Sequence, residues 1–146
     1  MKISTKGRYG LRALVDMAAN AQESPISLIQ TAKRQKISLN YLEQVFGTLR
    51  KAGIVVSVKG AGGGYKLSRD PSDITVKEIL EALEGEFSII DRTSEDKMDA
   101  MQKAVQELVW DKIDQNVNEF LEKRTLAQLV LEYQNNLGQS SDMYYI

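Results

Sequence analysis

The sequence predicts a mainly α-helical protein that carries one small β-hairpin. Apolar residues recur at helical spacing along much of the 146-residue chain. Four glycines fall within the five residues from Gly60 to Gly64, between short alternating segments that are typical of two strands joined by a turn. From residue 86 to residue 137 neither glycine nor proline occurs. We therefore expect a long helix in the second half of the chain.

Two helices are predicted at the start of the chain. Apolar residues at i, i+3, i+4, i+7 and i+8 indicate an amphipathic helix over about residues 5–21, and Pro25 breaks the chain after it. Ser27 and Gln30 have the spacing of a capping box, in which each side chain hydrogen-bonds the other residue's backbone amide. We expect a short second helix from this box to about residue 35.

A third helix completes a recognisable unit. Either Ser38 or Asn40 can cap it, Gly53 ends it, and its apolar stripe consists of Leu42, Val45, Phe46 and Leu49. Two helices joined by a few residues and preceded by a first helix have the organisation of a helix-turn-helix, here over about residues 27–53. The hairpin, over about residues 54–68, adds the wing of a winged helix.

The remaining residues predict three further helices. Thr75 and Glu78 form a second capping-box pattern, and the fourth helix, which they begin, stops at Gly85. A last helix restarts at Thr125 and runs to about residue 133. The long helix between them carries an apolar stripe made of Met98, Met101, Val105, Leu108, Ile113, Val117, Phe120 and Leu121.

An apolar stripe of this length needs a partner. About 26 helical residues reach roughly 40 Å, which a small winged helix cannot cover. The helix packs either on a second copy of the chain or on another protein, and a homodimer is the commoner solution. We assign residues 85–146 to dimerisation helices and a C-terminal tail. The expected interface residues are Met101, Val105, Leu108, Ile113, Val117 and Phe120.

Composition excludes several classes of function. The chain has no cysteine and no histidine, which removes thiol nucleophiles, the usual zinc sites and imidazole bases. No apolar run is long enough to span a membrane and the N-terminus lacks a signal peptide's apolar segment, so we expect a cytoplasmic protein. The glycine-rich loop fits neither a dinucleotide fingerprint nor a P-loop, because Tyr65 stands where each motif requires its next glycine.

The net charge of -1 conceals a strong asymmetry. Residues 1–70 hold 12 basic and 4 acidic side chains, giving +8, and the remainder holds 7 and 16, giving -9. The first half is therefore a candidate for binding a polyanion, although two solvated faces of opposite charge would give the same count. Basic residues suited to phosphate contacts are Lys6, Arg8, Arg34, Lys36, Arg50 and Lys51.

The third helix also has a polar face. Asn40, Glu43, Gln44 and Gly47 lie opposite its apolar stripe. Amide side chains suit adenine and a carboxylate can accept from cytosine, so this face can read bases in a major groove. The alternative is an ordinary solvated face. Lys59 flanks the glycine tip of the hairpin, where it can enter a minor groove, unless the hairpin is a plain surface hairpin with incidental lysines.

Four stretches resemble the Rrf-type winged helix-turn-helix transcriptional regulators. They are residues 1–10, 37–44, 49–53 and 63–67, and the likeness runs through about residue 85. It implies a homodimer that binds an inverted-repeat operator in double-stranded DNA, with residues 1–84 as the DNA-binding domain. The residues that it assigns to DNA are Thr5, Lys6, Tyr9, Ser38, Asn40, Tyr41, Glu43, Gln44, Arg50, Lys59 and Gly63.

One departure favours a particular branch of that family. Cluster-binding members, such as the iron-sulfur cluster regulator IscR, carry three cysteines where this chain has residues 86–96 and none. The sequence resembles instead the branch of the cysteine metabolism repressor CymR, which has no cofactor and senses sulfur status through cysteine synthase. The resemblance implies that Tyr145 and Ile146 bind that enzyme, with the terminal carboxylate replacing a substrate carboxylate. The alternative is that these residues pack on the dimer.

The sequence is compatible with two functions and argues against a third. The first is a DNA-binding regulator, most simply a repressor. The second is a winged-helix module that binds protein and not DNA. An enzyme is disfavoured, because the acidic side chains are dispersed along the chain.

Overall fold

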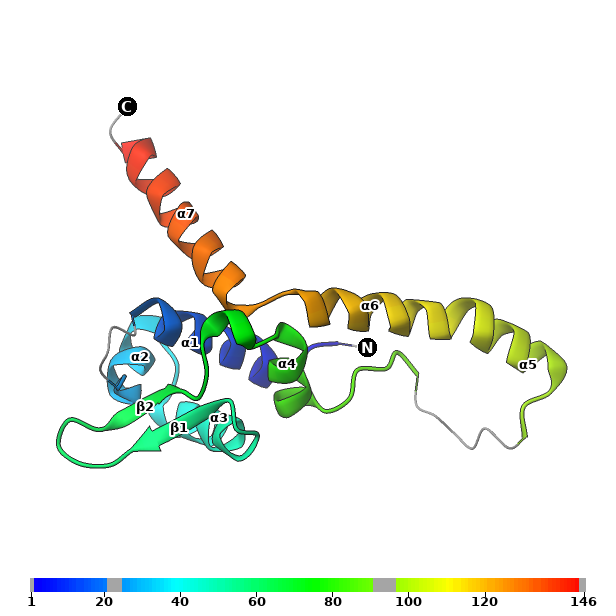
Figure 1. Cartoon of the computed structure of the whole chain (residues 1–146), viewed down its shortest axis with the longest axis horizontal. Coiled ribbons are helices and arrows are strands. Elements are labelled where there is room, and N and C mark those ends of the chain that lie inside the picture. Colours follow the sequence, from blue (N-terminus) through cyan, green and yellow to red (C-terminus); the bar gives the residue numbers. More distant parts are fainter. Residues whose placement is uncertain (1, 21–24, 91–96, 145–146) are drawn as a thin grey trace.

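The computed structural model describes residues 2–20, 25–90 and 97–144 and shows a mainly helical protein with a two-stranded wing. The helices and strands of the body, in chain order, are α1 (Thr5–Asn20), α2 (Leu28–Gln35), α3 (Leu39–Lys51), β1 (Val55–Val58), β2 (Gly64–Leu67), the 3-10 turn η1 (Pro71–Asp73) and α4 (Val76–Glu84). They are followed by α5 (Ala100–Val105), the π-helical turn η3 (Gln106–Trp110), α6 (Asp111–Lys123) and α7 (Leu126–Tyr144). Figure 1 shows α1–α4 and the wing gathered into one body, from which the α5–α6 rod and α7 extend in different directions.

The helix boundaries in the first half agree with the sequence, with one correction. The Ser38 side chain caps α3 by accepting a hydrogen bond from the Tyr41 amide at 3.3 Å, and both hydrogen bonds of the Thr75 and Glu78 capping box form. The capping box predicted at Ser27 is wrong, because the Ser27 side chain makes no cap hydrogen bond. The chain leading into α2 is fixed instead by backbone pairing of Ile26 with Tyr65 of β2.

The main core lies where α1, α3, β1 and α4 meet. Its fully buried side chains include those of Leu14, Met17, Leu42, Phe46, Leu49, Ile54, Ile74, Ile79 and Leu126. Leu126 begins α7, and its amide donates to the Ile74 carbonyl at 2.9 Å. A second cluster joins α4 to the end of α6 through Val76, Leu80 and Leu121. The joint between α6 and α7 is therefore anchored on the body.

The wing is a tight antiparallel hairpin. Val55 pairs with Leu67 and Val58 with Gly64, and the turn between the strands has Gly60 at φ +111°. The outer edge of β2 pairs with Ile26 through two backbone hydrogen bonds of 2.8 and 2.9 Å. A Cβ on Gly64 would lie 2.3 Å from the Ile26 carbonyl oxygen, so this close approach requires glycine.

The predicted long helix is continuous over residues 100–123 but is not regular. Its middle turn is π-helical, and Gln106 donates to the Asp111 carboxylate at 2.7 Å across it. A π turn takes up one more residue than an α turn. The wider turn therefore reduces the rotation about the helix axis between Leu108 and Ile113, which are five residues apart.

The last helix is longer than predicted. We expected α7 to end near residue 133, and it extends to Tyr144. Gly138 lies inside it, because a single glycine weakens a helix by only about 1 kcal/mol. The partner-binding residues predicted in the tail, Tyr145 and Ile146, lie outside the described residues.

Two glycines of the wing should respond differently to alanine. Gly64→Ala forces a methyl group against the Ile26 carbonyl and should cost about 1 to 3 kcal/mol of unfolding free energy. Gly62→Ala is the matched control, because a Cβ there meets nothing within 4 Å. Urea unfolding of both variants measures the difference, and equal stabilities would contradict the close approach.

Candidate nucleic-acid interface

The two faces of α3 differ sharply. Leu42, Val45, Phe46 and Leu49 are each at most 1% exposed and hold one side of the helix against the core. The opposite side is open to solvent, and the predicted base-reading side chains on it are all exposed: Ser38, Asn40, Glu43 and Gln44. Burial of the apolar face thus determines which side chains α3 presents to a partner.

The first turn of α1 lies beside the first turn of α3. The Thr5 and Tyr41 hydroxyl oxygens are 3.4 Å apart, and the Tyr9 ring meets the Tyr41 ring edge-on with centroids at 6.4 Å. Lys6 lies on the same turn of α1 as Thr5 and is half-buried. The structure therefore brings together residues that the sequence assigns separately to backbone contacts and to base reading.

The wing and the end of α3 add exposed cations. Lys59 and Lys66 lie on either side of the hairpin tip, and Arg50 lies in the last turn of α3; all three are exposed. Gly63 has a structural task, because its amide donates to the Gly60 carbonyl at 2.9 Å and a Cβ would come 2.2 Å from the Val58 carbonyl.

Arg34, which the sequence analysis assigns to phosphate contact, instead forms an ion pair within the protein. Its guanidinium pairs with the buried Asp16 carboxylate at 2.6 Å, and Gln35 donates to the same carboxylate at 2.7 Å. The hydrogen bond to Asp16 raises the pKa of Arg34, and partial burial opposes that shift. Arg34 therefore ties α2 to α1, because a buried carboxylate needs a charged partner.

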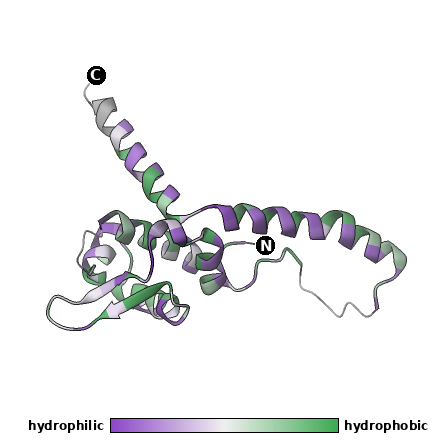
Figure 2. Ribbon diagram, viewed as in Figure 1, coloured by the Kyte–Doolittle hydropathy of each residue, from purple (hydrophilic) through white to green (hydrophobic). Residues whose placement is uncertain are grey.

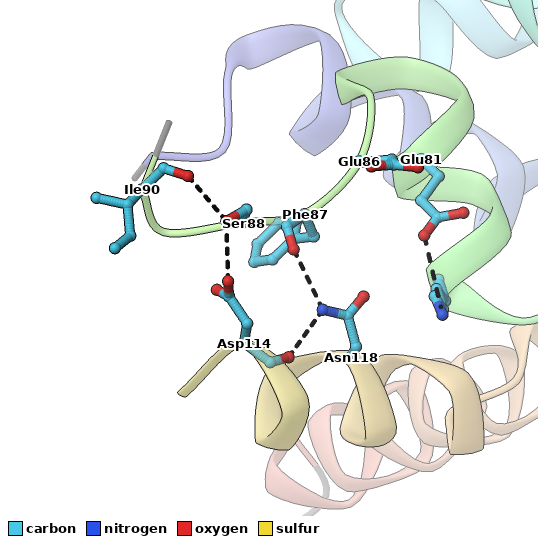
Figure 3. A pocket seen from close by; sticks show the side chains of 8 residues that line it. Glu81, Glu86, Phe87, Ser88, Ile90, Asp114 and Asn118 are labelled. Atoms are coloured by element: carbon cyan, nitrogen blue, oxygen red, sulfur yellow. Dashed lines mark hydrogen bonds and ion pairs between the residues drawn. The ribbon is translucent and has the colours of Figure 1, made fainter. Parts of the chain in front are cut away.

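An open cavity of about 540 Å³ lies between α4, residues 86–90 and α6 (Figure 3). Asp114 of α6 accepts from the Ser88 hydroxyl and the Ile89 amide, both at 2.8 Å. Asn118 donates to the Phe87 carbonyl at 3.1 Å. Three of the side chains that line this cavity, those of Ser88, Asp114 and Asn118, thus fasten residues 86–90 to the rod.

The described residues contain no cluster of side chains suited to bind a metal ion. Across residues 2–20, 25–90 and 97–144, no three acidic, histidine or cysteine side chains converge as metal ligands. The whole sequence contains no cysteine. A cluster bound by three cysteines is therefore excluded on the chemistry of the side chains.

The stripe on the rod divides into two parts. Met101, Leu108 and Phe120 are 78%, 75% and 57% exposed, whereas Leu121 is buried and Val117 packs on α4. Val105 and Ile113 are also exposed. Figure 2 shows hydrophobic and hydrophilic residues alternating along this rod. Apolar side chains thus remain uncovered along most of it.

Sequence reasoning missed one residue of the interface region. Glu84, at the end of α4, accepts hydrogen bonds from the backbone amides of Ser4 and Gly7. These partners are about 80 residues away in the sequence, so no local pattern reveals the contact.

An exposed polar recognition face, a cationic wing and an adjoining helix terminus define a winged helix-turn-helix DNA-binding protein. A family model for Rrf2, described as an iron-dependent transcriptional regulator, matches residues 3–132. The chain belongs to the Rrf2 family and is a DNA-binding transcriptional regulator, not an enzyme.

Named relatives agree with this assignment. The transcriptional regulator IscR of Aliivibrio salmonicida is 36% identical over 142 residues, covering 97% of this chain and 83% of that protein. The solved structure of CymR, the global cysteine regulator of B. subtilis, is 41% identical with a TM-score of 0.78, covering 90% of this chain and 98% of that one. The structure of T. potens IscR is also 41% identical, with a TM-score of 0.72, and the coverages are 91% and 88%.

Among the described residues, none of the helices combines the length and the apolar character needed to cross a membrane.

Proposed function

We propose that this Rrf2-family regulator is a cytoplasmic homodimer that represses transcription by binding an inverted-repeat operator. The observation that carries the proposal is the convergence of the first turns of α1 and α3 at the Thr5 and Tyr41 hydroxyls. It places candidate phosphate-contacting and base-reading side chains on one surface. In the proposed complex α3 enters the major groove and the wing reaches the minor groove. The two-fold symmetry of the dimer then matches that of the operator.

The residues divide into two roles in this proposal. The side chains exposed on α3 read bases, and those around it contact the phosphate backbone. The reading group is Ser38, Asn40, Tyr41, Glu43 and Gln44, and the backbone group is Thr5, Lys6, Tyr9 and Arg50. Lys59, at the tip of the wing, contributes charge in the minor groove, and Gly63 shapes the tip that carries it.

Two alanine variants separate these roles. Gln44→Ala should relax preference at one base position per half-site, at a cost of about 1 to 3 kcal/mol for the favoured base. Arg50→Ala should weaken binding to all duplexes alike and lower the salt slope by about one. Operator selection from a random duplex pool, followed by titration at several salt concentrations, measures both. A uniform loss in both variants would show that Gln44 does not read sequence.

Duplex binding also tests the competing function, a winged helix that binds only protein. Neutralising Z phosphates gives a log-log salt slope near -0.9Z, whereas a protein adaptor shows no such dependence. Absence of salt-dependent duplex binding would therefore reject the proposed repressor.

The proposed dimer uses the stripe on the rod, which consists of the exposed Met101, Val105, Leu108, Ile113 and Phe120 together with the half-buried Val117. Leu108 is at its centre and is three-quarters exposed in the single chain. A monomer would leave this apolar surface in water, which favours association. Val105, Leu108 and Ile113 are exposed before, within and after η3, so the stripe can pair along its length with a second copy.

Leu108→Glu should convert the protein to a monomer, because the dimer would bury an unpaired carboxylate. Gln115→Glu adds the same charge on an exposed position of α6 and should leave the dimer intact. Sedimentation at micromolar concentration measures both. A Leu108→Glu variant that remains dimeric would remove the stripe from the interface.

We further propose that the regulated genes belong to cysteine or sulfur metabolism. The support is the likeness to the B. subtilis cysteine regulator together with the lack of cysteine ligands in this chain. Cysteine synthase is the proposed partner, and Tyr145 with Ile146 is the proposed contact, on the evidence of the sequence alone.

The partner contact is tested by Ile146→Asp. Placing a charge in an apolar pocket should abolish complex formation with cysteine synthase, while DNA binding and dimerisation persist. Ser141→Asp is the control for added charge nearby. Titration calorimetry measures the complex, and undiminished binding by Ile146→Asp would reject the tail as the ligand.

A further inference from the structure

The carboxylate of Glu84 caps the N-terminus of α1, a role that residues of the helix itself fill in an ordinary capping box. One of its oxygens accepts from the Ser4 amide at 3.0 Å and from the Gly7 amide at 2.9 Å, and the Ser4 hydroxyl also donates to it. In an ordinary capping box two side chains share these tasks. Here a single residue from the end of α4 accepts from both the amide of Ser4, which precedes α1, and the amide of Gly7, the third residue of α1.

The approach of Glu84 to α1 depends on Gly7. A Cβ at this position would lie 2.4 Å from the bound carboxylate oxygen and 2.9 Å from the Ile3 side chain. Any larger residue would displace the carboxylate from the helix. Capping by Glu84 thus requires glycine at position 7, although the two residues are far apart in the sequence.

The turn that Glu84 holds carries residues of the proposed interface. Thr5 and Lys6 lie between the two anchored amides, and the Thr5 hydroxyl is 3.4 Å from the Tyr41 hydroxyl. We propose that Glu84 is a positioning residue for DNA binding, which holds this turn so that Thr5 and Lys6 contact phosphate. The inference rests on the interface proposed above.

Glu84 is in turn held from the side of the rod. Gly85, which follows it, has φ +88° and ends α4, with its amide donating to the Glu81 carbonyl at 2.9 Å. Residues 86–90 are then fastened to α6 through Asp114 and Asn118. The backbone is therefore held both before Glu84, by α4, and after it, by the contacts of residues 86–90 with α6. A residue held in this way can fix the position of the first turn of α1.

Charge alone predicts the opposite effect. A carboxylate near a polyanion repels it, so its removal should strengthen DNA binding if Glu84 is an ordinary surface acid. The positioning role predicts weaker binding on removal. The sign of the change therefore separates the two explanations.

The test uses the full-length chain and a mixed-sequence duplex, with binding measured by fluorescence anisotropy at several NaCl concentrations. Glu84→Ala should bind about tenfold more weakly, because the freed turn must be ordered again before Thr5 and Lys6 can contact phosphate; tenfold corresponds to about 1.4 kcal/mol. Its salt slope should fall by about one phosphate contact per subunit. Glu84→Gln keeps an acceptor oxygen and should bind within about threefold of the parent protein.

Glu81→Ala is the matched control, because Glu81 lies on the same helix and pairs with Lys77 at 3.9 Å. It removes the same charge without touching α1 and should bind at least as tightly as the parent. If Glu84→Ala binds as tightly as Glu81→Ala, the proposal is overturned. A change in melting temperature without a change in salt slope would also overturn it, because it would show a purely structural role.

Two more variants complete the test. Glu84→Asp keeps the charge but is too short to reach both amides, so it should weaken binding even if Glu84→Ala fails to fold; parent-like binding by it would overturn the proposal. Lys6→Ala tests the underlying interface, since it should lower the salt slope by itself. If Lys6→Ala has the same salt slope as the parent protein, the proposed interface is rejected. If the salt slope falls in Lys6→Ala but equals that of the parent in Glu84→Asp, only the role of Glu84 is rejected.

Discussion

The burial of one face of α3 is the constraint on which the rest of the structure depends. Four apolar side chains over residues 42–49 have almost no exposed surface and lock the rotation of the helix about its axis. A shift of one residue would turn this face by about 100° and bury polar groups. The exposed row that begins at Ser38 is therefore a consequence of core packing. The free energy that folds the body also orients the face that we assign to DNA.

The two halves of the chain have opposite charge and different shapes. The first 70 residues carry +8 and form most of the compact body, whereas the remaining residues carry -9 and include the extended rod and α7 (Figure 1). A polyanion is attracted to the body and repelled by the rest. This distribution orients the molecule on a duplex before any specific contact is made, and it leaves the rod free for association with a second copy.

Sequence patterns were sufficient where a structure is determined by neighbouring residues. The Thr75 and Glu78 capping box, the glycine turn of the wing and the apolar face of α3 all depend on residues within one or two turns. The prediction at Ser27 failed because Ile26, the residue before it, pairs with Tyr65 far along the chain. Arg34 and Glu84 likewise take their roles from partners on other helices, which no local spacing encodes.

The rod departs from regular α-helical geometry at its middle turn, yet apolar residues on both sides of that turn are exposed. The step of five residues from Leu108 to Ile113 breaks α-helical spacing, and in a regular helix it would carry the second residue away from the stripe. The π turn reduces the rotation over this step, and both Leu108 and Ile113 are exposed. Beyond Ile113, Val117 and Leu121 pack on α4, whereas Phe120 stays exposed. The same helix therefore leaves apolar residues exposed for the proposed dimer and also packs on α4, whose last residue holds the first turn of α1.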